Sequence, residues 1–261
     1  MIIDSHCHLN TKELELDLDN ILQEAYNNNV TEFIIVGFDK YTNLKTLELS
    51  NKFNNMYSTL GLHPSDVDLY NDNDLKEFKE LVELNKTKIK AIGECGLDYH
   101  WNNNKIGQEK LLRMQIELSL KYNLPLIIHN REATSDLYNI FKDYKNLKGV
   151  MHCFTESYEY AKKFINLGFY LSFGGVLTFK KSEELRQTCK KIPLDKIIVE
   201  TDTPYLTPEP FRSKPNRPKY IVYTLKKLSE IHELPYEDMI KITRNNTIKL
   251  FNLGEYKYEK I

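Results

Sequence analysis

Two histidines near the start of the chain, His6 and His8, are spaced so that both side chains could bind one metal ion. They follow Ile2 and Ile3, whose apolar side chains predict a short β-strand. Because strand side chains alternate between two faces, residues two apart point the same way, and Asp4 shares that face one step deeper. Imidazole is a common metal ligand, so the pair favours a metal site, although an isolated pair of this kind is more often incidental.

More residues of metal-binding type follow other apolar runs. They are Glu94, His129, His152 and Asp202. Glu200 stands two residues before Asp202, so we expect both acids on one face of a strand. Burying a charged carboxylate at the end of an apolar strand costs desolvation free energy unless a cation lies beside it. Each residue alone is better explained as a histidine satisfied by hydrogen bonds or as a loop acid, but the combination predicts a metal centre.

The alternation of apolar runs with helical patterns predicts βαβ units. Eight such units favour an α/β fold, a (β/α)8 TIM barrel in a single domain over residues 1–261, in which the C-terminal ends of the strands share one rim. A doubly wound open sheet is the alternative, because sequence does not reveal barrel closure. The expected strands are Ile2–Asp4, Glu32–Val36, Tyr57–Gly61, Ala91–Gly93, Leu126–His129, Val150–His152, Phe169–Ser172 and Ile197–Glu200, and the expected last helices are Tyr220–His232 and Tyr236–Phe251.

The overall composition excludes some classes of protein. The formal net charge is -1, so there is no global basic field for nucleic acid, although a local basic patch stays possible. No stretch approaches the roughly 20 apolar residues of a membrane span. The first residues lack a signal-peptide pattern, and the 4 cysteines form no CxxC pair. We therefore expect a cytoplasmic monomer with no membrane partner.

These motifs together resemble the TatD family of metal-dependent deoxyribonucleases, within the wider group of amidohydrolase-like barrels. The combination is highly specific and covers nearly the whole chain. Glu156 and Ser213 stand where the family usually has glycine, which bears on substrate preference and leaves the metal residues intact. The matching stretches are Asp4–Leu9, Gly61–Pro64, Gly93–Tyr99, His129–Arg131, His152–Phe154, Ser172–Gly175 and Glu200–Leu206.

The resemblance implies a centre of two divalent metal ions. His6 and His8 would hold one ion with Asp202 beside it, His129 and His152 would hold the other, and Glu94 would bridge them. The two carboxylates cancel only half the charge of two such ions, so the centre would attract an anionic phosphodiester. Imidazole-rich sites suit Zn, Mn or Co better than Mg, whereas the family is usually described as Mg-dependent, and both remain open.

Roles for individual residues follow from the same resemblance. Asp202 would orient or deprotonate the attacking water, with Glu94 and His63 also catalytic. Asp4 and Glu200 would support the metal ligands. Expected substrate contacts, through charge or base stacking, are Arg131, Tyr99, Tyr205, Arg212 and Lys214.

The leading functional hypothesis is hydrolysis of DNA phosphodiester bonds, as a deoxyribonuclease acting on single strands or ends. The alternative is an amidohydrolase-type enzyme that cleaves a small ester, lactone or amide, and a third possibility is a metal-binding barrel without turnover. The cluster of basic residues between Arg212 and Lys219 favours the nuclease over the small-molecule hydrolase. The presence of Asp202 speaks against a barrel without turnover.

Overall fold

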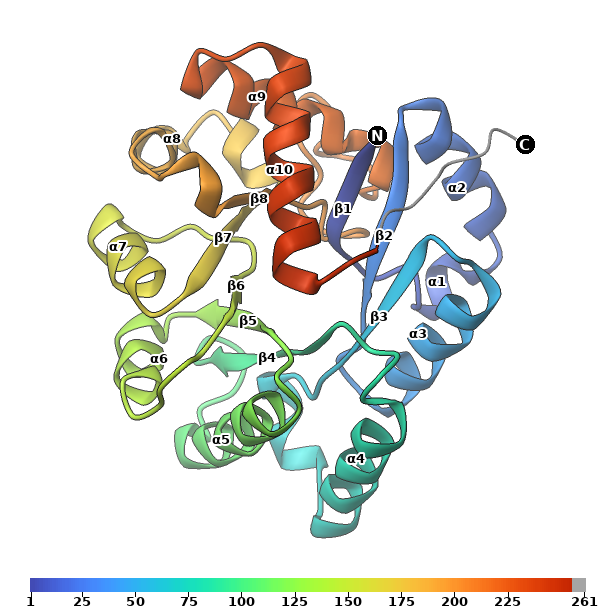
Figure 1. Cartoon of the computed structure of the whole chain (residues 1–261), viewed down its shortest axis with the longest axis vertical. Coiled ribbons are helices and arrows are strands. Elements are labelled where there is room, and N and C mark those ends of the chain that lie inside the picture. The colour runs from blue at the N-terminus through green and yellow to red at the C-terminus, as the bar shows by residue number, and fades with distance from the viewer. Residues whose placement is uncertain (255–261) are drawn as a thin grey trace.

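Strands and helices alternate along the chain, and the strands form the centre of the molecule (Figure 1). The computed structural model describes residues 1–254, so the end of the predicted domain, residues 255–261, lies outside the described part. Within that part, eight strands pair in chain order in one parallel sheet. They are β1 (Ile2–Cys7), β2 (Val30–Val36), β3 (Met56–Leu60), β4 (Ala91–Asp98), β5 (Leu126–Arg131), β6 (Gly149–Met151), β7 (Phe169–Phe173) and β8 (Ile197–Val199).

The first and last strands meet at a seam that backbone hydrogen bonds close. Cys7 forms a parallel bridge with Thr203. The amide of His8 donates to the carbonyl of Thr203 at 2.8 Å, and the amide of Asp202 donates to the carbonyl of His6 at 2.9 Å. The sheet is therefore a nearly closed barrel, which confirms the predicted fold class and excludes the open doubly wound sheet.

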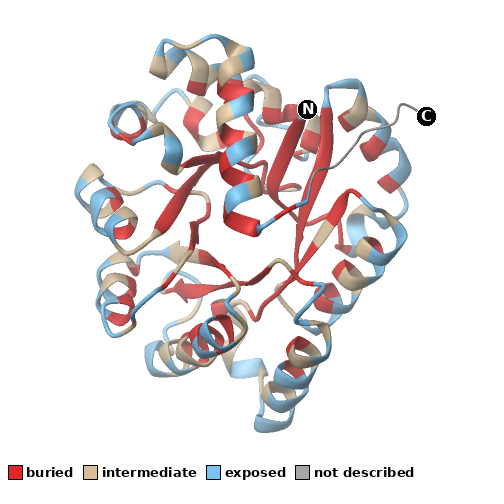
Figure 2. Cartoon of the chain, in the orientation of Figure 1, coloured by how far each residue is buried: buried red, intermediate tan, exposed pale blue. Residues whose placement is uncertain are grey.

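Helices surround the barrel and turn their buried sides toward it (Figure 2). Side chains cap the first turns of α3, α4, α5 and α7 and satisfy free amides there, as at α3, where Asp39 and Thr42 form a reciprocal capping box. The helices are α1 (Lys12–Glu15), α2 (Leu18–Asn27), α3 (Lys40–Lys52), α4 (Asp72–Asn85), α5 (Lys105–Tyr122), α6 (Thr134–Phe141), α7 (Tyr158–Asn166), α8 (Glu183–Lys190), α9 (Ile221–His232) and α10 (Tyr236–Phe251), with 3-10 turns η1 (Pro64–Leu69), η2 (Gly175–Thr178), η3 (Leu194–Lys196) and η4 (Pro218–Tyr220).

Apolar side chains cover both faces of the sheet. Every residue of β2 and β4 is buried, as expected for parallel strands between an inner core and outer helices. The inner core contains Ile34 and Ile127, and it continues into Leu250 and Phe251 at the end of α10. Figure 1 shows α10 crossing in front of the ring of strands. Its last turn therefore closes the end of the barrel at which the strands begin.

The observed strands differ from the predicted ones mainly at their C-terminal ends. β1 continues to Cys7 and β4 to Asp98, whereas β8 stops at Val199. The extensions contain buried polar side chains, which an apolar pattern cannot reveal. The expectation that Glu200 and Asp202 share one face of a strand is wrong, because both residues lie beyond the end of β8 and Asp202 has a φ of 59°.

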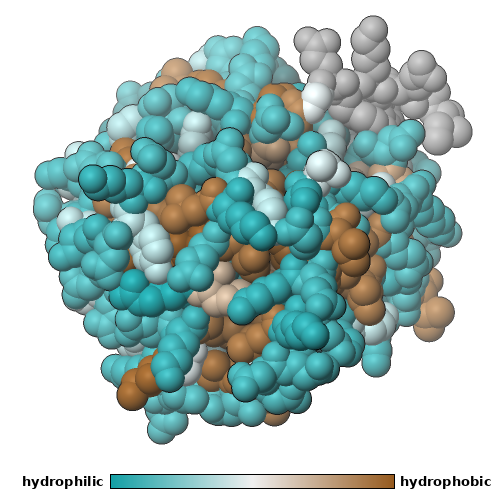
Figure 3. Space-filling model, turned by 60° about the horizontal axis from the view of Figure 1, so that its bottom comes forward, coloured by the Kyte–Doolittle hydropathy of each residue, from teal (hydrophilic) through white to brown (hydrophobic). Residues whose placement is uncertain are grey.

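The surface is mostly hydrophilic, with hydrophobic side chains in separate patches on the face that Figure 3 shows. No helix within residues 1–254 is long and apolar enough to cross a membrane.

Candidate metal centre

The six predicted ligands meet at the C-terminal rim of the barrel. His6, Glu94 and His129 lie within strands. His8 and His152 directly follow strands, and Asp202 lies three residues beyond the end of β8. All are buried except His129, whose side chain is 18% exposed. The barrel thus collects these residues from strands that are far apart in the sequence.

Two glycines allow neighbouring backbones to approach closely beside these ligands. A Cβ at Gly61 would lie 2.4 Å from the backbone nitrogen of Glu94. A Cβ at Gly96, whose φ is +150°, would lie 2.0 Å from the carbonyl oxygen of His129. Any larger residue would push β3 or β5 away from β4, so glycine at these positions lets the strands pack closely beside Glu94 and His129.

Glu94 is the centre of the cluster, and its two carboxylate oxygens face different imidazoles. Oε2 lies 3.5 Å from Nε2 of both His6 and His8. Oε1 lies 3.0 Å from Nδ1 of His129 and 3.0 Å from Nε2 of His152. One carboxylate therefore stands between two separate groups of nitrogen donors, as a bridging ligand must.

Asp202 completes the group around His6 and His8. Its Oδ1 lies 3.6 Å from Nε2 of His6 and 3.4 Å from Nε2 of His8. Within the described residues, three sets of donor atoms lie mutually within 4.8 Å. They are His6, His8 and Glu94; His63, Glu94 and His129; and His6, His152 and Asp202.

The donor set fits a divalent cation. Nδ1 of His8 lies 3.0 Å from the carbonyl oxygen of Val36, which can only accept, so this nitrogen carries the ring proton. The lone pair of Nε2 then faces oxygens of Glu94 and Asp202, and this arrangement is repulsive unless a proton or a metal cation lies between the nitrogen and the oxygens. Two imidazole nitrogens with two carboxylate oxygens are a common ligand set for zinc and manganese.

The carboxylates of the cluster are held in their charged form. Burial raises the pKa of Glu94, but the imidazoles of His152 and His129 outweigh burial and hold it well below the usual value. Burial likewise raises the pKa of Asp202, and the contacts with His8 and His6 lower it further than burial raises it. Both side chains are therefore anionic near neutral pH, which is the state that binds a cation.

Comparisons with known proteins agree with this geometry. The family described as TatD related DNase matches residues 3–252. The uncharacterized metal-dependent hydrolase YabD of Bacillus subtilis is 40% identical over 97% of this chain and 100% of its own length. The crystal structure of the TatD homolog YJJV from Escherichia coli superposes with a TM-score of 0.92, at 30% identity, over 97% of this chain and 98% of that one.

The chain belongs to the TatD family. It is accordingly a metal-dependent hydrolase, and the cluster around Glu94 is its candidate metal centre. An uncharacterized amidohydrolase from Saccharomyces cerevisiae shares the fold, with a TM-score of 0.80 at 18% identity over 96% of this chain and 100% of that one.

The two acids predicted to support the metal ligands, Glu200 and Asp4, have different partners. Oε1 of Glu200 lies 3.4 Å from Nδ1 of His152 and accepts a hydrogen bond from the amide of Cys153 at 2.6 Å. Asp4 makes no contact with an imidazole; it accepts hydrogen bonds from the amide and hydroxyl of Thr201, at 2.9 Å and 2.5 Å. Burial raises the pKa of Asp4 to about 7, against the effect of these bonds. Glu200 thus contacts a candidate ligand, and Asp4 ties β1 to the segment that leads to Asp202.

Asp98 contacts a candidate ligand and was not among the residues predicted from the sequence. Its Oδ2 lies 2.9 Å from Nε2 of His129, and its side chain is buried. The spacing of Glu94 and Asp98 on one strand could have revealed it, because residues four apart share a face. His63, which was predicted to be catalytic, lies near the same carboxylate oxygen as His129, with its Nε2 3.5 Å from Oε1 of Glu94.

The predicted aromatic contacts differ in their positions. Tyr205 is 55% exposed, and its ring lies 6.2 Å from the ring of His8, at the edge of the centre. The hydroxyl of Tyr99 instead donates to Asp136 at 2.8 Å. Tyr99 is therefore already engaged on the outer side of the barrel, and Tyr205 is the better placed of the two for a bound substrate.

The predicted cations also differ in their availability. The guanidinium of Arg131 lies 5.3 Å from the centre of the exposed Trp101 ring, and that of Arg212 lies 3.7 Å from the centre of the Phe179 ring. Neither these two nor Lys214 forms an ion pair within residues 1–254. Arg217 differs, because ion pairs join it to Asp17 and Glu24 of the N-terminal part of the chain.

Lys219 likewise pairs with Glu24, at 2.8 Å. The basic cluster predicted between Arg212 and Lys219 is therefore split. Its first half is free to meet an anion, and its second half fastens the loop to α2.

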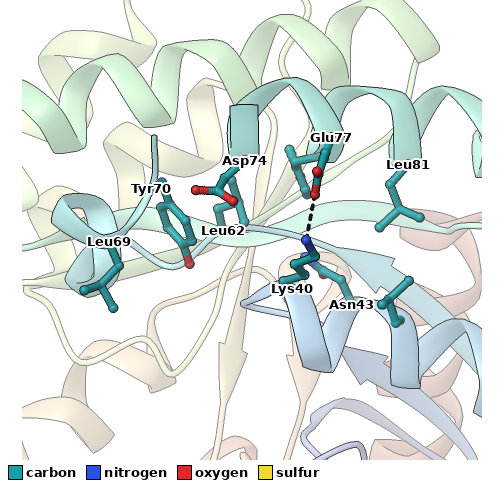
Figure 4. A pocket seen from close by; sticks show the side chains of 10 residues that line it. Lys40, Asn43, Leu62, Leu69, Tyr70, Asp74, Glu77 and Leu81 are labelled. Carbon is teal, nitrogen blue, oxygen red and sulfur yellow. Dashed lines mark hydrogen bonds and ion pairs between the residues drawn. The ribbon is translucent and has the colours of Figure 1, made fainter. Parts of the chain in front are cut away.

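A separate apolar cleft lies on the outside of the barrel, away from the metal centre (Figure 4). It has a volume of about 250 Å³ and lies between α3, η1 and α4, with the ion pair of Lys40 and Glu77 across it. None of the candidate ligands lines this cleft. The cleft is therefore separate from the candidate metal centre.

Proposed function

We propose that this chain is a deoxyribonuclease that hydrolyses phosphodiester bonds of single-stranded DNA or of DNA ends with the help of two divalent cations. The observation that carries the proposal is the position of Glu94, whose two oxygens face two different groups of imidazoles. Paired metal ions that share a carboxylate are typical of enzymes that cleave phosphodiesters.

The two groups would hold one cation each. His6, His8 and Asp202 would bind the first cation, and His129 and His152 would bind the second, with Glu94 between them. Cations bound here supply Lewis acidity that polarises a phosphoryl oxygen and acidifies water.

Asp202 is the candidate for moving the proton of the attacking water. Its contacts with His8 and His6 keep the carboxylate ionised, so an oxygen of Asp202 can accept a proton. Its backbone is fixed by the hydrogen bond to the carbonyl of His6 at the barrel seam. The proton acceptor is therefore held rigidly beside the first group of ligands, which favours reaction geometry.

His63 is the candidate donor to the leaving oxygen or to a phosphate oxygen. The amide of Ser65 donates to Nδ1 of His63 at 3.2 Å, so the ring proton lies on Nε2. Nε2 faces Glu94, and the His63 side chain is 17% exposed, so a substrate at the C-terminal rim can reach it. His63 is therefore oriented to donate a hydrogen bond toward the reacting group.

Support for DNA as the substrate comes from the family and from the rim. The matching family is described as TatD related DNase. Within residues 1–254, Arg131 and Arg212 form no ion pair with a carboxylate, and the exposed rings of Trp101 and Tyr205 offer surfaces on which bases can stack. An electropositive metal centre beside exposed aromatic rings suits a strand end better than the interior of a duplex, where bases are already stacked.

The alternative function is hydrolysis of a small ester, lactone or amide. The observation that favours it is the ion pairing of Arg217 and Lys219, which leaves fewer cations for a long anionic strand than the sequence predicts. A small neutral substrate would need the metal centre and no rim cations.

The deciding experiment measures cleavage of end-labelled single-stranded and duplex DNA by the purified protein with Mg, Mn, Zn or Co, and with a chelator as control. A panel of small esters, lactones and amides is assayed in parallel. We expect metal-dependent release of nucleotides from single strands. Turnover of a small ester or amide without DNA cleavage under any metal would overturn the proposal in favour of the alternative.

A further inference from the structure

A second groove lies at the opposite end of the barrel from the metal centre. It has a volume of about 650 Å³, which is within the usual range for small-molecule sites. Its walls come from the residues that precede β4, β5 and β6 and from the end of α10. Leu250 and Phe251, which close the interior of the barrel, form part of its floor.

Four lysines line this groove, and no aspartate or glutamate among the described residues does so. They are Lys86, Lys90, Lys148 and Lys249. Lys86 pairs with Glu83, but the other three form no ion pair with a carboxylate within residues 1–254. Lys90 and Lys148 are half-buried, so their charges are less screened by water than those of fully exposed side chains.

This concentration of positive charge is local, because the whole chain has a formal net charge of -1. Ammonium groups gathered around one cavity repel each other, and a bound anion would remove that repulsion. Thr87 and Asn123 also line the groove, and their side chains add hydrogen-bond donors. The polar part of the groove is therefore suited to a multiply charged anion such as a phosphate ester.

The apolar part of the groove is suited to a flat ring. The half-buried Tyr122 lines it together with Leu124 and Pro125, and the largely buried Tyr170 and Phe251 lie beneath. Nζ of Lys86 lies 5.6 Å from the centre of the Tyr122 ring, which places a cation directly beside an aromatic surface. Aromatic side chains next to lysines can bind a base through stacking and its phosphates through charge.

We propose that this lysine groove binds a free nucleoside phosphate at a site separate from the metal centre. The inference is independent of the proposed nuclease function, because it uses neither the metal ligands nor the rim cations. The volume of the groove suits one ligand of nucleotide size, so a single nucleotide is expected and not a polymer.

The test is calorimetric titration of the full-length, metal-loaded protein with ADP, repeated after addition of a chelator. The chelator removes binding of phosphates to the metal centre and leaves binding to lysines intact. We expect ADP binding that resists the chelator and weakens as salt rises, because salt screens the lysine charges. Adenosine, which lacks phosphates, should bind at least about tenfold more weakly, since charge-assisted hydrogen bonds to phosphate are lost.

The decisive variant is Lys148→Gln/Lys249→Gln, whose positions make no ion pair within the described residues. The matched control, Lys110→Gln/Lys226→Gln, removes the same charge from the exposed surfaces of α5 and α9. We expect at least about tenfold weaker ADP binding in the first variant and wild-type binding in the control. Thermal melting checks that both variants are folded.

Three outcomes would overturn the proposal. The groove variant could bind ADP as the wild type does, all ADP binding could disappear with the chelator, or a short oligodeoxynucleotide could bind this groove more tightly than ADP. DNA cleavage by the groove variant is measured as well, and it should remain at the wild-type level whether or not the nuclease assignment is correct.

Discussion

The two ends of this barrel are built from the same strands, yet they carry different chemistry. At the C-terminal rim, histidines and carboxylates converge on Glu94. At the other end, Leu250 and Phe251 of α10 close the barrel, and lysines surround the groove beside them. The comparison shows that a nearly neutral chain can place different charges at the two ends of the barrel axis. Carboxylates that can bind cations lie at one end, and at the other end three of the four groove lysines have no acidic partner within residues 1–254.

The N-terminal end also contains a buried ion pair with no evident role in chemistry. Nη1 of Arg244 lies 2.5 Å from Oε1 of Glu32, and the hydroxyl of Tyr57 donates to the same carboxylate at 2.9 Å. The Glu32 side chain is 0% exposed, so it is at least as deeply buried as any of the candidate metal ligands. Burial alone thus does not distinguish function from stability. The difference is that the acid of Glu32 is matched by a permanent cation, whereas Glu94 faces imidazoles.

The largest effect should follow from removing one group of metal ligands. In His6→Ala/His8→Ala we expect the loss of about one divalent ion per chain together with nearly all turnover, because two of the four donors around that position disappear. Elemental analysis of the folded variant measures the ion content. A wild-type metal content would contradict the assignment, and Glu32→Gln, at the opposite end, is the control that should keep its metal.

Asp202→Asn tests chemistry at the same rim while keeping the shape of the side chain. We expect turnover to fall by on the order of 10²–10⁴ because the amide cannot accept the proton of the attacking water. DNA affinity should change much less, since the lost interaction belongs to the transition state. Single-turnover kinetics with a separate binding assay distinguish these quantities. The control is Asp195→Asn, which alters a carboxylate away from the centre. Cleavage at the wild-type rate by Asp202→Asn would exclude the role.

Glu32→Gln should have the opposite effect to Asp202→Asn, because it should lower the free energy of unfolding and leave turnover unchanged. Removing one partner of a buried ion pair leaves the Arg244 charge uncompensated, which costs about 3–5 kcal/mol of unfolding free energy. Denaturant unfolding measures the change, and turnover per folded molecule should stay the same. Glu80→Gln, which breaks the exposed pair of Lys76 and Glu80, is the control and should have little effect. If turnover fell as well, the two ends would be coupled.

The smallest effect is expected from the unpaired cations of the rim. In Arg212→Gln/Lys214→Gln, binding of single-stranded DNA should weaken, and the log–log salt slope should flatten by about 1.4 if both residues meet phosphates. Cleavage of a small phosphodiester should change little. Fluorescence titrations at several salt concentrations give the slope, with Lys110→Gln/Lys226→Gln as the charge-matched control. An unchanged slope would mean that neither Arg212 nor Lys214 contacts a phosphate of bound DNA.

The features that could be predicted from the sequence are those that depend on the pattern of neighbouring residues. The helix Tyr236–Phe251 was predicted with the bounds that the structure has, because its apolar spacing lies within one segment. The six candidate ligands were predicted because each follows an apolar run, and parallel strands bring such positions to one rim. Asp98 was missed because it lies four residues beyond Glu94, where the apolar pattern ends and the strand continues.

The sequence alone determined the order of strands and helices and the types of side chain that each strand delivers to the rim, since both depend on neighbouring residues. Only the tertiary structure decided the rest. At the barrel seam, the amide of Asp202 donates to the carbonyl of His6, which lies far away in the sequence. The two oxygens of Glu94 contact different imidazoles only because the strands that carry these residues pack together in the barrel. Whether a lysine or arginine is free or paired is likewise decided by partners far away in the chain, as Arg217 and Glu24 show, because electrostatic attraction depends on distance in space and not on distance in sequence.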